Sequence, residues 1–228
     1  WEYLLKLLSC QDNKLHESLD CEIKKKLYVI GESPALVSHG LNIKTPSGAF
    51  ICKSLLIKGC MQWHLGDALK NQYKNKFEGI FHSLQKSSTV LLTIGEIDCR
   101  LNSGIIKHRN KHPEKNITQL ISTTIENYLN YIYKINSNYK HKITIQGVPC
   151  PNINTKNIPK EKVIELVNLI REFNIILKNK STEFGFEFLD LYKLTDRGDG
   201  LSNQTWNIDE YHLSPEGVHE AWRIHSSN

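Results

Sequence analysis

The sequence has no long hydrophobic run. A helix that crosses a bilayer needs about 18 or more consecutive apolar residues. The longest apolar stretches of this 228-residue chain, such as residues 90–92, are only strand-sized, so we predict no membrane span. No signal-peptide pattern follows Trp1. Because the chain opens at Trp1 without a methionine, we expect it to be part of a longer protein.

Closely spaced cysteine pairs are also missing. The six cysteines are Cys10, Cys21, Cys52, Cys60, Cys99 and Cys150. None belongs to a Cys-x-x-Cys pair, which excludes a zinc ribbon and a thioredoxin-type redox motif. Cys52 and Cys60 lie in or beside apolar segments, where reduced, buried thiols are common. This cysteine usage favours a reducing, cytoplasmic setting.

Concentrated positive charge is lacking as well. The net charge is +5, and the basic residues are dispersed apart from residues 24–26 and 107–112. Nucleic-acid binding requires a basic patch, so we predict no nucleic-acid partner. His108 and His112 have the spacing of two metal ligands on a helix, but Pro113 and the neighbouring charges predict a loop there. We therefore expect no metal and no other cofactor.

Short apolar segments alternate with long amphipathic ones along the chain. The expected strands are residues 26–30, 54–57, 89–94, 142–148 and 186–189. The expected helices are residues 61–85, 117–135 and 160–182, and a last helix begins at Ser214-Pro215. This alternation predicts an α/β fold in which helices cover both faces of a parallel sheet of about five strands.

The chain length suits one α/β domain and is too short for two. We expect this domain over residues 26–228, and residues 1–25 are predicted to be an N-terminal helical extension or linker. In a parallel sheet the active site lies beyond the carboxyl ends of the strands. Gly31, Gly59 and Gly95 follow three such ends, so the residues next to them are the candidates for a site.

A serine follows the first expected strand in the run Gly31-Glu32-Ser33-Pro34. A serine at a tight strand-to-helix turn can present its hydroxyl above the sheet, where the first N–H groups of the following helix stabilise an anion. The alternative is structural, because a serine before a proline is a common helix N-cap. Ser33 alone leaves both interpretations open.

Asp209 and His212 stand three residues apart before the last expected helix. A carboxylate that bonds one imidazole nitrogen fixes the tautomer and leaves the other nitrogen as a general base. The alternative is an Asp that caps backbone N–H groups beside an incidental His. Together with Ser33, the pair supplies the three parts of a nucleophilic hydrolase. The usual Gly-x-Ser-x-Gly elbow is absent, since Ala35 replaces its last glycine.

Four blocks, in order, resemble those of SGNH/GDSL hydrolases. They are Gly31-Glu32-Ser33, the isolated Gly59, Gly95-Glu96-Ile97-Asp98 and Asp209-x-x-His212-Leu213, and the resemblance spans about residues 26–225. The run from Gly95 to Cys99-Arg100 also resembles a poorly characterised subgroup. The resemblance implies a three-layer α/β/α, flavodoxin-like fold and ester hydrolysis or acyl transfer. It also implies Ser33 as nucleophile, His212 as base, Asp209 as its partner, and the N–H groups of Ser33 and Gly59 as the oxyanion hole.

Two positions depart from the family pattern. Glu32 stands where the family usually has Asp, and Ile97 stands where it usually has an oxyanion-binding Asn. Isoleucine has no side-chain donor, and the loss of one oxyanion donor typically costs about 10²–10³ in rate. Arg100 and Asn102, just downstream, are the candidate replacements. We hypothesise that Arg100 points into the site; the alternative is an ion pair of Arg100 with a neighbouring acid.

Four further residues are predicted to bind substrate: Glu96, Asp98, Arg100 and Trp63. For Trp63 the alternative is simple packing. The first interpretation of the chain is a serine esterase that acts on a small-molecule or glycan ester, with carbohydrate O-acyl groups suggested by resemblance alone. An O-acyltransferase with the same triad and a non-catalytic binding module are the alternatives. The sequence does not determine the oligomeric state.

Overall fold

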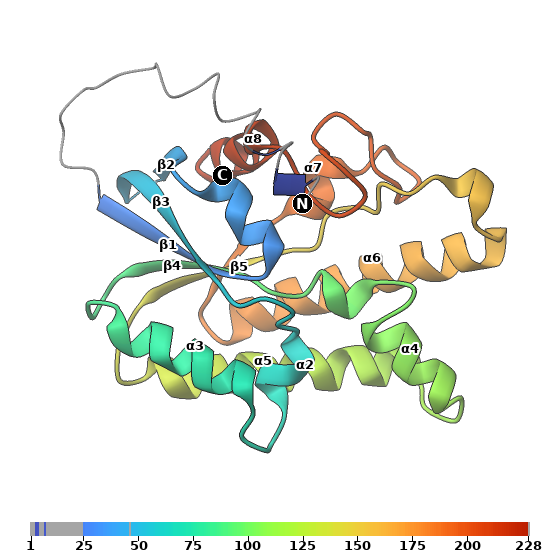
Figure 1. Ribbon diagram of the computed structural model, residues 1–228, viewed down its shortest axis with the longest axis horizontal. Helices are drawn as coiled ribbons and strands as arrows, with labels where there is room; N and C mark the ends of the chain where they lie inside the picture. Colours follow the sequence, from blue (N-terminus) through green and yellow to red (C-terminus); the bar gives the residue numbers. More distant parts are fainter. Residues whose placement is uncertain (1–2, 5–6, 8–24, 46, 228) are drawn as a thin grey trace.

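A computed structural model of the protein describes residues 3–4, 7, 25–45 and 47–227. These residues fold around a six-stranded sheet with the strand order β2-β3-β1-β4-β5-β6 (Figure 1). The strands are β1 (Lys25–Gly31), β2 (Asn42–Thr45), β3 (Gly48–Leu56), β4 (Thr89–Thr93), β5 (Lys142–Gln146) and β6 (Glu187–Leu189).

Seven α-helices are present in the described part of the chain. They are α2 (Gln62–Gly66), α3 (Gln72–Ser83), α4 (Gly104–Lys111), α5 (Ile117–Asn136), α6 (Lys160–Glu183), α7 (Leu191–Thr195) and α8 (Pro215–His225). Three short 3₁₀ helices join them: η1 (Ser33–Ser38), η2 (Ile97–Cys99) and η3 (Thr155–Asn157). Over the same residues, no helix combines the length and the apolarity needed to span a bilayer.

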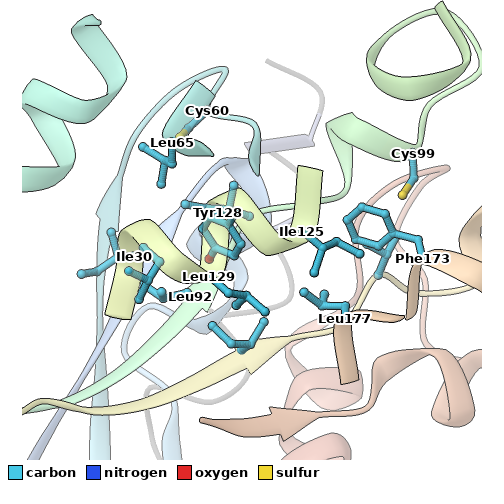
Figure 2. Packing of buried hydrophobic residues seen from close by; sticks show 14 of the residues in the cluster. Ile30, Cys60, Leu65, Leu92, Cys99, Ile125, Tyr128, Leu129, Phe173 and Leu177 are labelled. Atoms are coloured by element: carbon cyan, nitrogen blue, oxygen red, sulfur yellow. The ribbon is translucent and has the colours of Figure 1, made fainter. Parts of the chain in front are cut away.

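The sheet is the middle of three layers. Helices α2 to α6 pack on one face, and η1, α7 and α8 pack on the other (Figure 1). A hydrophobic core lies on each face of the sheet: the first under α2 to α6 and the second under η1, α7 and α8. Successive strand residues point into opposite cores, so Val90 and Leu92 of β4 are buried in the first and Leu91 in the second. Figure 2 shows the first core, where the rings of Tyr128 and Phe173 lie among aliphatic side chains such as Ile125. The predicted α/β/α fold is therefore confirmed.

Five of the six strands are parallel, and their order is the flavodoxin-like one. The sixth strand, β2, pairs antiparallel with β3 at the edge and was not predicted. The expected start of the second strand at residue 54 is also wrong, because β3 begins at Gly48. In this edge hairpin the buried residues Ile43, Phe50 and Cys52 alternate with exposed or half-buried ones, so no continuous apolar run marks it.

The single helix predicted over residues 61–85 is in fact two helices. Residues 67–71 interrupt it, and the side chain of Asn71 starts α3 by accepting the backbone N–H groups of Tyr73 and Lys74. An Asn that accepts these bonds favours a new helix start over helix continuation. The apolar spacing continues across the break, which is why the pattern alone predicts one helix.

Residues 104–111 form α4, so the loop predicted around His108 is wrong. Ile105 and Ile106 anchor this helix in the first core, although most of its other side chains are polar. His112 ends the helix as its C-cap, with its ring 4.8 Å from that of His108. No group of three metal-ligating side chains occurs in the part of the chain that the structure describes.

The cysteines with described positions are buried free thiols: Cys52, Cys60, Cys99 and Cys150. Cys10 and Cys21 lie outside the described residues. The cytoplasmic setting inferred from the cysteines stays a prediction.

The N-terminal extension predicted over residues 1–25 lies mostly outside the described residues. Of those that are described, Leu7 is buried in the second core, and Lys25 begins β1. The boundary between extension and domain stays a prediction.

Gly31 ends β1 at a point where the chain has no room for a side chain. A Cβ at this position would lie 2.1 Å from Thr93 Oγ1 and 2.5 Å from the Thr93 carbonyl oxygen on β4. We predict that Gly31→Ala lowers the free energy of unfolding by about 1–3 kcal/mol, because the backbone must move to relieve the overlap. Chemical denaturation measures this change.

Gly79 of α3 is the matched control, since a Cβ there would meet no heavy atom within 4 Å. Gly79→Ala should raise the free energy of unfolding by about 0.5–1 kcal/mol, as expected inside a helix. A Gly31→Ala protein as stable as the parent would contradict the close packing of β1 on β4.

Candidate active site

Ser33 follows β1 at the carboxyl edge of the sheet. Its neighbour Glu32 is the N-cap of η1, and the Glu32 carboxylate accepts the Ser33 backbone N–H. The structural alternative for Ser33, in which it caps the helix, is therefore wrong. Because Glu32 performs the capping, the Ser33 hydroxyl is left to bond other side chains.

His212 comes from the opposite end of the chain, in the loop before α8. Its Nε2 lies 2.8 Å from Ser33 Oγ, and its Nδ1 lies 2.9 Å from both carboxylate oxygens of Asp209. The structure thus brings together the three residues predicted to be catalytic. The ring nitrogen that faces Asp209 carries a proton when it donates, which leaves Nε2 directed at the serine.

Asp209 is held in place by the backbone as well as by the imidazole. Its Oδ1 accepts the N–H groups of Tyr211 and His212, each at 2.8 Å. Burial raises the pKa of the Asp209 carboxyl, but the hydrogen bonds from His212 and Tyr211 outweigh burial and bring the pKa below its ordinary value. Asp209 is therefore an anion that fixes the tautomer and orientation of His212.

The loop that carries Asp209 and His212 is fixed before and after these two residues. Asn207 forms an antiparallel bridge with Leu213, and the Ser214 side chain accepts the N–H of Gly217 to begin α8. The predicted N-cap at Ser214 is confirmed. Since α8 is anchored in the second core by Trp222, His212 reaches Ser33 from a rigid support.

The N–H groups predicted to form the oxyanion hole both point to Glu32. Gly59 donates to Glu32 Oε1 at 3.0 Å and Ser33 donates to Glu32 Oε2 at 2.5 Å. Gly59 has a φ of +74°, a left-handed conformation that glycine adopts without strain. The Ser33 hydroxyl also donates to Glu32. The sequence marks Glu32 only as a departure from the Asp of the family pattern and carries no signal for these contacts.

The ionisation of Glu32 follows from these donors. Burial raises the pKa of its carboxyl, but hydrogen bonds from the Ser33 hydroxyl and the two N–H groups, helped by the charge of Arg100, lower the pKa below its ordinary value. Glu32 is therefore an anion at neutral pH.

Arg100 pairs with Glu96, as in the alternative considered from the sequence. Its Nε lies 2.8 Å from Glu96 Oε1, its terminal nitrogen lies 2.5 Å from Oε2, and its guanidinium lies 4.3 Å from the centre of the Tyr211 ring. Burial lowers the pKa of Arg100, but the hydrogen bonds and charge of Glu96 outweigh burial, so the pKa lies above its ordinary value. Arg100 does not bond the Ser33 hydroxyl; it helps to form the wall of a neighbouring cavity.

Two of the residues predicted to bind substrate lie away from the serine. Asp98 is completely buried, and its carboxylate accepts the backbone N–H groups of Gln62 and Trp63 at the start of α2. Burial raises the pKa of Asp98 to about 7. Trp63 is exposed and lines a separate cavity with His108. These contacts give Asp98 a structural role, and Trp63 lines a cavity that neither Ser33 nor His212 borders.

Two cavities are lined by residues that neighbour Ser33 or His212 in the sequence. The small one, of about 20 Å³, is lined on one side by Pro34 and Leu213, the residues that follow Ser33 and His212. The larger one has a volume of about 650 Å³ and includes Arg100 and Asn102 in its walls. Both cavities share four lining residues: Glu96, Val148, Pro149 and Tyr211.

Tyr3 covers one face of the histidine. Its ring stacks on His212 with centroids 3.8 Å apart and an interplanar angle of 17°, and its hydroxyl donates to the Ser33 carbonyl at 3.2 Å. Burial, with the charges of Asp209 and Glu32, raises the pKa of Tyr3, so that the hydroxyl stays neutral. The sequence carries no signal for this contact, because nothing in the pattern of residues 1–25 relates them to the site.

Comparisons with known proteins identify the family and the fold of the chain. A model of the GDSL-like lipase/acylhydrolase family matches residues 35–222, beginning two residues after Ser33. A search of curated protein sequences finds no match.

Three solved structures illustrate the shared fold. A protein proposed to be a GDSL-like lipase from Parabacteroides merdae is 15% identical, with a TM-score of 0.55 over 90% of this chain and 98% of its own. An extracellular lipase from Streptomyces rimosus is 14% identical, with a TM-score of 0.52 over 88% and 99%. A GDSL-like lipase from Bacteroides thetaiotaomicron is 15% identical, with a TM-score of 0.52 over 88% and 85%.

The family model covers most of the chain, and the solved structures share its fold. The resemblance inferred from the four sequence blocks is thereby confirmed, and the non-catalytic interpretation is set aside. The chain belongs to the GDSL-like lipase/acylhydrolase family and is an enzyme that hydrolyses esters.

Proposed function

We propose that the protein is a serine esterase that works through an acyl-enzyme, with Ser33 as nucleophile, His212 as general base and Asp209 as the group that orients it. The observation that carries this proposal is the 2.8 Å separation of Ser33 Oγ and His212 Nε2, with Asp209 on the other ring nitrogen. A hydroxyl, a base in hydrogen-bond reach and an orienting carboxylate are the parts that nucleophilic catalysis requires.

In the first step, His212 Nε2 takes the Ser33 proton while Oγ attacks the ester carbonyl carbon. Asp209 accepts the Nδ1–H and stabilises the imidazolium that forms. When the tetrahedral intermediate collapses, the bond to the leaving oxygen breaks, and the imidazolium protonates that oxygen. Water then attacks the acyl-enzyme by the same route and releases the acid.

The oxyanion would be bound by the N–H groups of Ser33 and Gly59. Both belong to the loops that leave the carboxyl edge of the sheet, and both already bind a carboxylate in the resting structure. Ile97 offers no side-chain donor, so the backbone supplies the stabilisation.

We assign the acyl group to the small cavity. A volume of about 20 Å³ exceeds the roughly 10–15 Å³ that one water needs, which suits the methyl of an acetyl ester and leaves no room for a long chain. Apolar side chains, among them Val37, Leu213 and Val218, form much of its lining.

We assign the alcohol part of the ester to the larger cavity, which adjoins the small one. Its walls combine the Tyr211 ring with polar groups, including Arg100, Asn102 and Glu210. A ring face beside hydrogen-bonding groups suits a carbohydrate, so O-acetylated sugars are the proposed substrate class. If a sugar hydroxyl replaced water in the second step, the same groups would perform acyl transfer.

Ser33→Ala should lower kcat/KM for p-nitrophenyl acetate by about 10⁴ or more, because the nucleophile is lost. Asp209→Asn should cost about 10⁴ in kcat through the wrong histidine tautomer. Ser83→Ala, an exposed serine on α3, is the control and should leave the rate unchanged. Equal hydrolysis of an ester panel by Ser33→Ala and the parent would overturn the proposed nucleophile.

The size of the small cavity predicts a preference for short acyl chains. The parent should hydrolyse p-nitrophenyl acetate at least about tenfold more efficiently than the octanoate, measured as kcat/KM. Val218→Ala removes two methyl groups from the cavity wall and should shift the preference toward butyrate.

Val29→Ala is the matched control, because Val29 is buried in the same core and does not line the cavity. Both substitutions should cost roughly 2 kcal/mol of stability, but only Val218→Ala should change chain-length preference. A parent that favours octanoate, or an equal shift in both variants, would contradict the assignment.

Acyl transfer is tested separately from hydrolysis. Sugars are added to the p-nitrophenyl acetate assay, and the formation of acetylated sugar is measured.

A further inference from the structure

The carboxylate of Glu32 lies where the proposed mechanism needs an empty site. Oε1 accepts the N–H of Gly59 at 3.0 Å, and Oε2 accepts both the N–H and the hydroxyl of Ser33. The two N–H groups are the pair that the proposed function assigns to the oxyanion. A carboxylate resembles an oxyanion in charge and in its acceptor oxygens, so Glu32 and a bound substrate would compete for the same donors.

The Ser33 hydroxyl faces the same competition. It carries one proton, and two acceptors lie in reach: Glu32 Oε2 and His212 Nε2. While the hydroxyl donates to Glu32, it cannot donate to His212, and the general base is separated from the proton that it must remove. The contact therefore opposes both oxyanion binding and activation of the nucleophile.

Charge keeps the Glu32 carboxylate in this position. Three donors bond it, and the positive charge of Arg100 also favours the ionised form. Ile97 contributes no donor, so a substrate carbonyl would have no side-chain alternative at η2. Glutamate is one methylene longer than the aspartate that the family usually has. This extra length determines how far the carboxylate extends toward the Gly59 N–H.

We propose that Glu32 occupies the oxyanion hole of the resting enzyme, so that substrate must displace its carboxylate before Ser33 is acylated. This inference rests on the proposed function of Ser33 and His212. The need to displace Glu32 then lowers the rate of acylation. Hydrogen bonds to a charged group shift the equilibrium between the occupied and the empty hole by about 10- to 100-fold.

The test compares the full chain with Glu32→Ala, Glu32→Gln and Glu32→Asp, and uses Glu126→Ala as the control. Glu126 is an exposed glutamate on α5 with no part in the site. The measurement is the second-order rate at which a fluorophosphonate labels Ser33, because the phosphonyl oxygen must enter the hole. Ser33→Ala gives the background, and thermal unfolding of each variant establishes that it is folded.

Glu32→Ala should be labelled about 10- to 100-fold faster than the parent, with Glu126→Ala unchanged. Glu32→Gln, which keeps the length and removes the charge, should also be faster. Acetate should inhibit Glu32→Ala at least about tenfold more strongly than the parent, because the emptied hole accepts an external carboxylate. A residue that only positions Ser33 would produce slower labelling and no change in acetate inhibition.

The outcomes separate this inference from the proposed function. If Ser33 is labelled in the parent and every folded Glu32 variant is labelled at the same rate or more slowly, the inference is overturned and the proposed nucleophile stands. If no variant and no parent is labelled, the proposed function fails, and the inference fails with it. Labelling that appears only when Glu32 is replaced supports both.

Discussion

The parallel pairing of β1 with β3 and β4 is the constraint on which the site depends. Gly31 pairs with Leu56 on one side and with Thr93 on the other, so the three strands end at the same level. The loops that carry Ser33, Gly59 and Glu96 therefore leave the sheet at one edge. The missing side chain at Gly31 allows this closeness, because a Cβ would overlap the Thr93 backbone.

The second requirement is a rigid support for His212, which is 179 positions from Ser33 in the sequence. The helix α8 provides it, since its Trp222 is buried in the second core together with residues of η1 and the strands. Asp209 and His212 are close in sequence, so the loop can orient the imidazole locally. The contact between Ser33 and His212, which are far apart in the sequence, thus depends on the packing of α8 against the sheet. Burial of apolar side chains drives this packing.

Much of this was accessible from the sequence. The apolar strands and the four blocks led to the α/β/α fold, and they selected Ser33, Asp209 and His212, which the fold brings together. Other features depend on side-chain direction, which a pattern does not contain. The burial of Asp98, the stacking of Tyr3 on His212 and the direction of the Glu32 carboxylate are all of this kind. The sequence offered the ion pair of Arg100 as one of two alternatives, and the direction of the side chain decides between them.

The two departures from the family pattern, Glu32 and Ile97, have linked consequences. In the proposed mechanism, with Ile97 in place of a side-chain donor, the oxyanion hole consists of two backbone N–H groups, and the two oxygens of the Glu32 carboxylate engage both. A side-chain donor at position 97 would have been a third donor, which Glu32 would not engage and which a substrate could use. Because that donor is absent, displacement of one side chain changes the state of the whole hole. On the proposed role of Glu32, the position of this one carboxylate therefore controls when the site can stabilise a transition state.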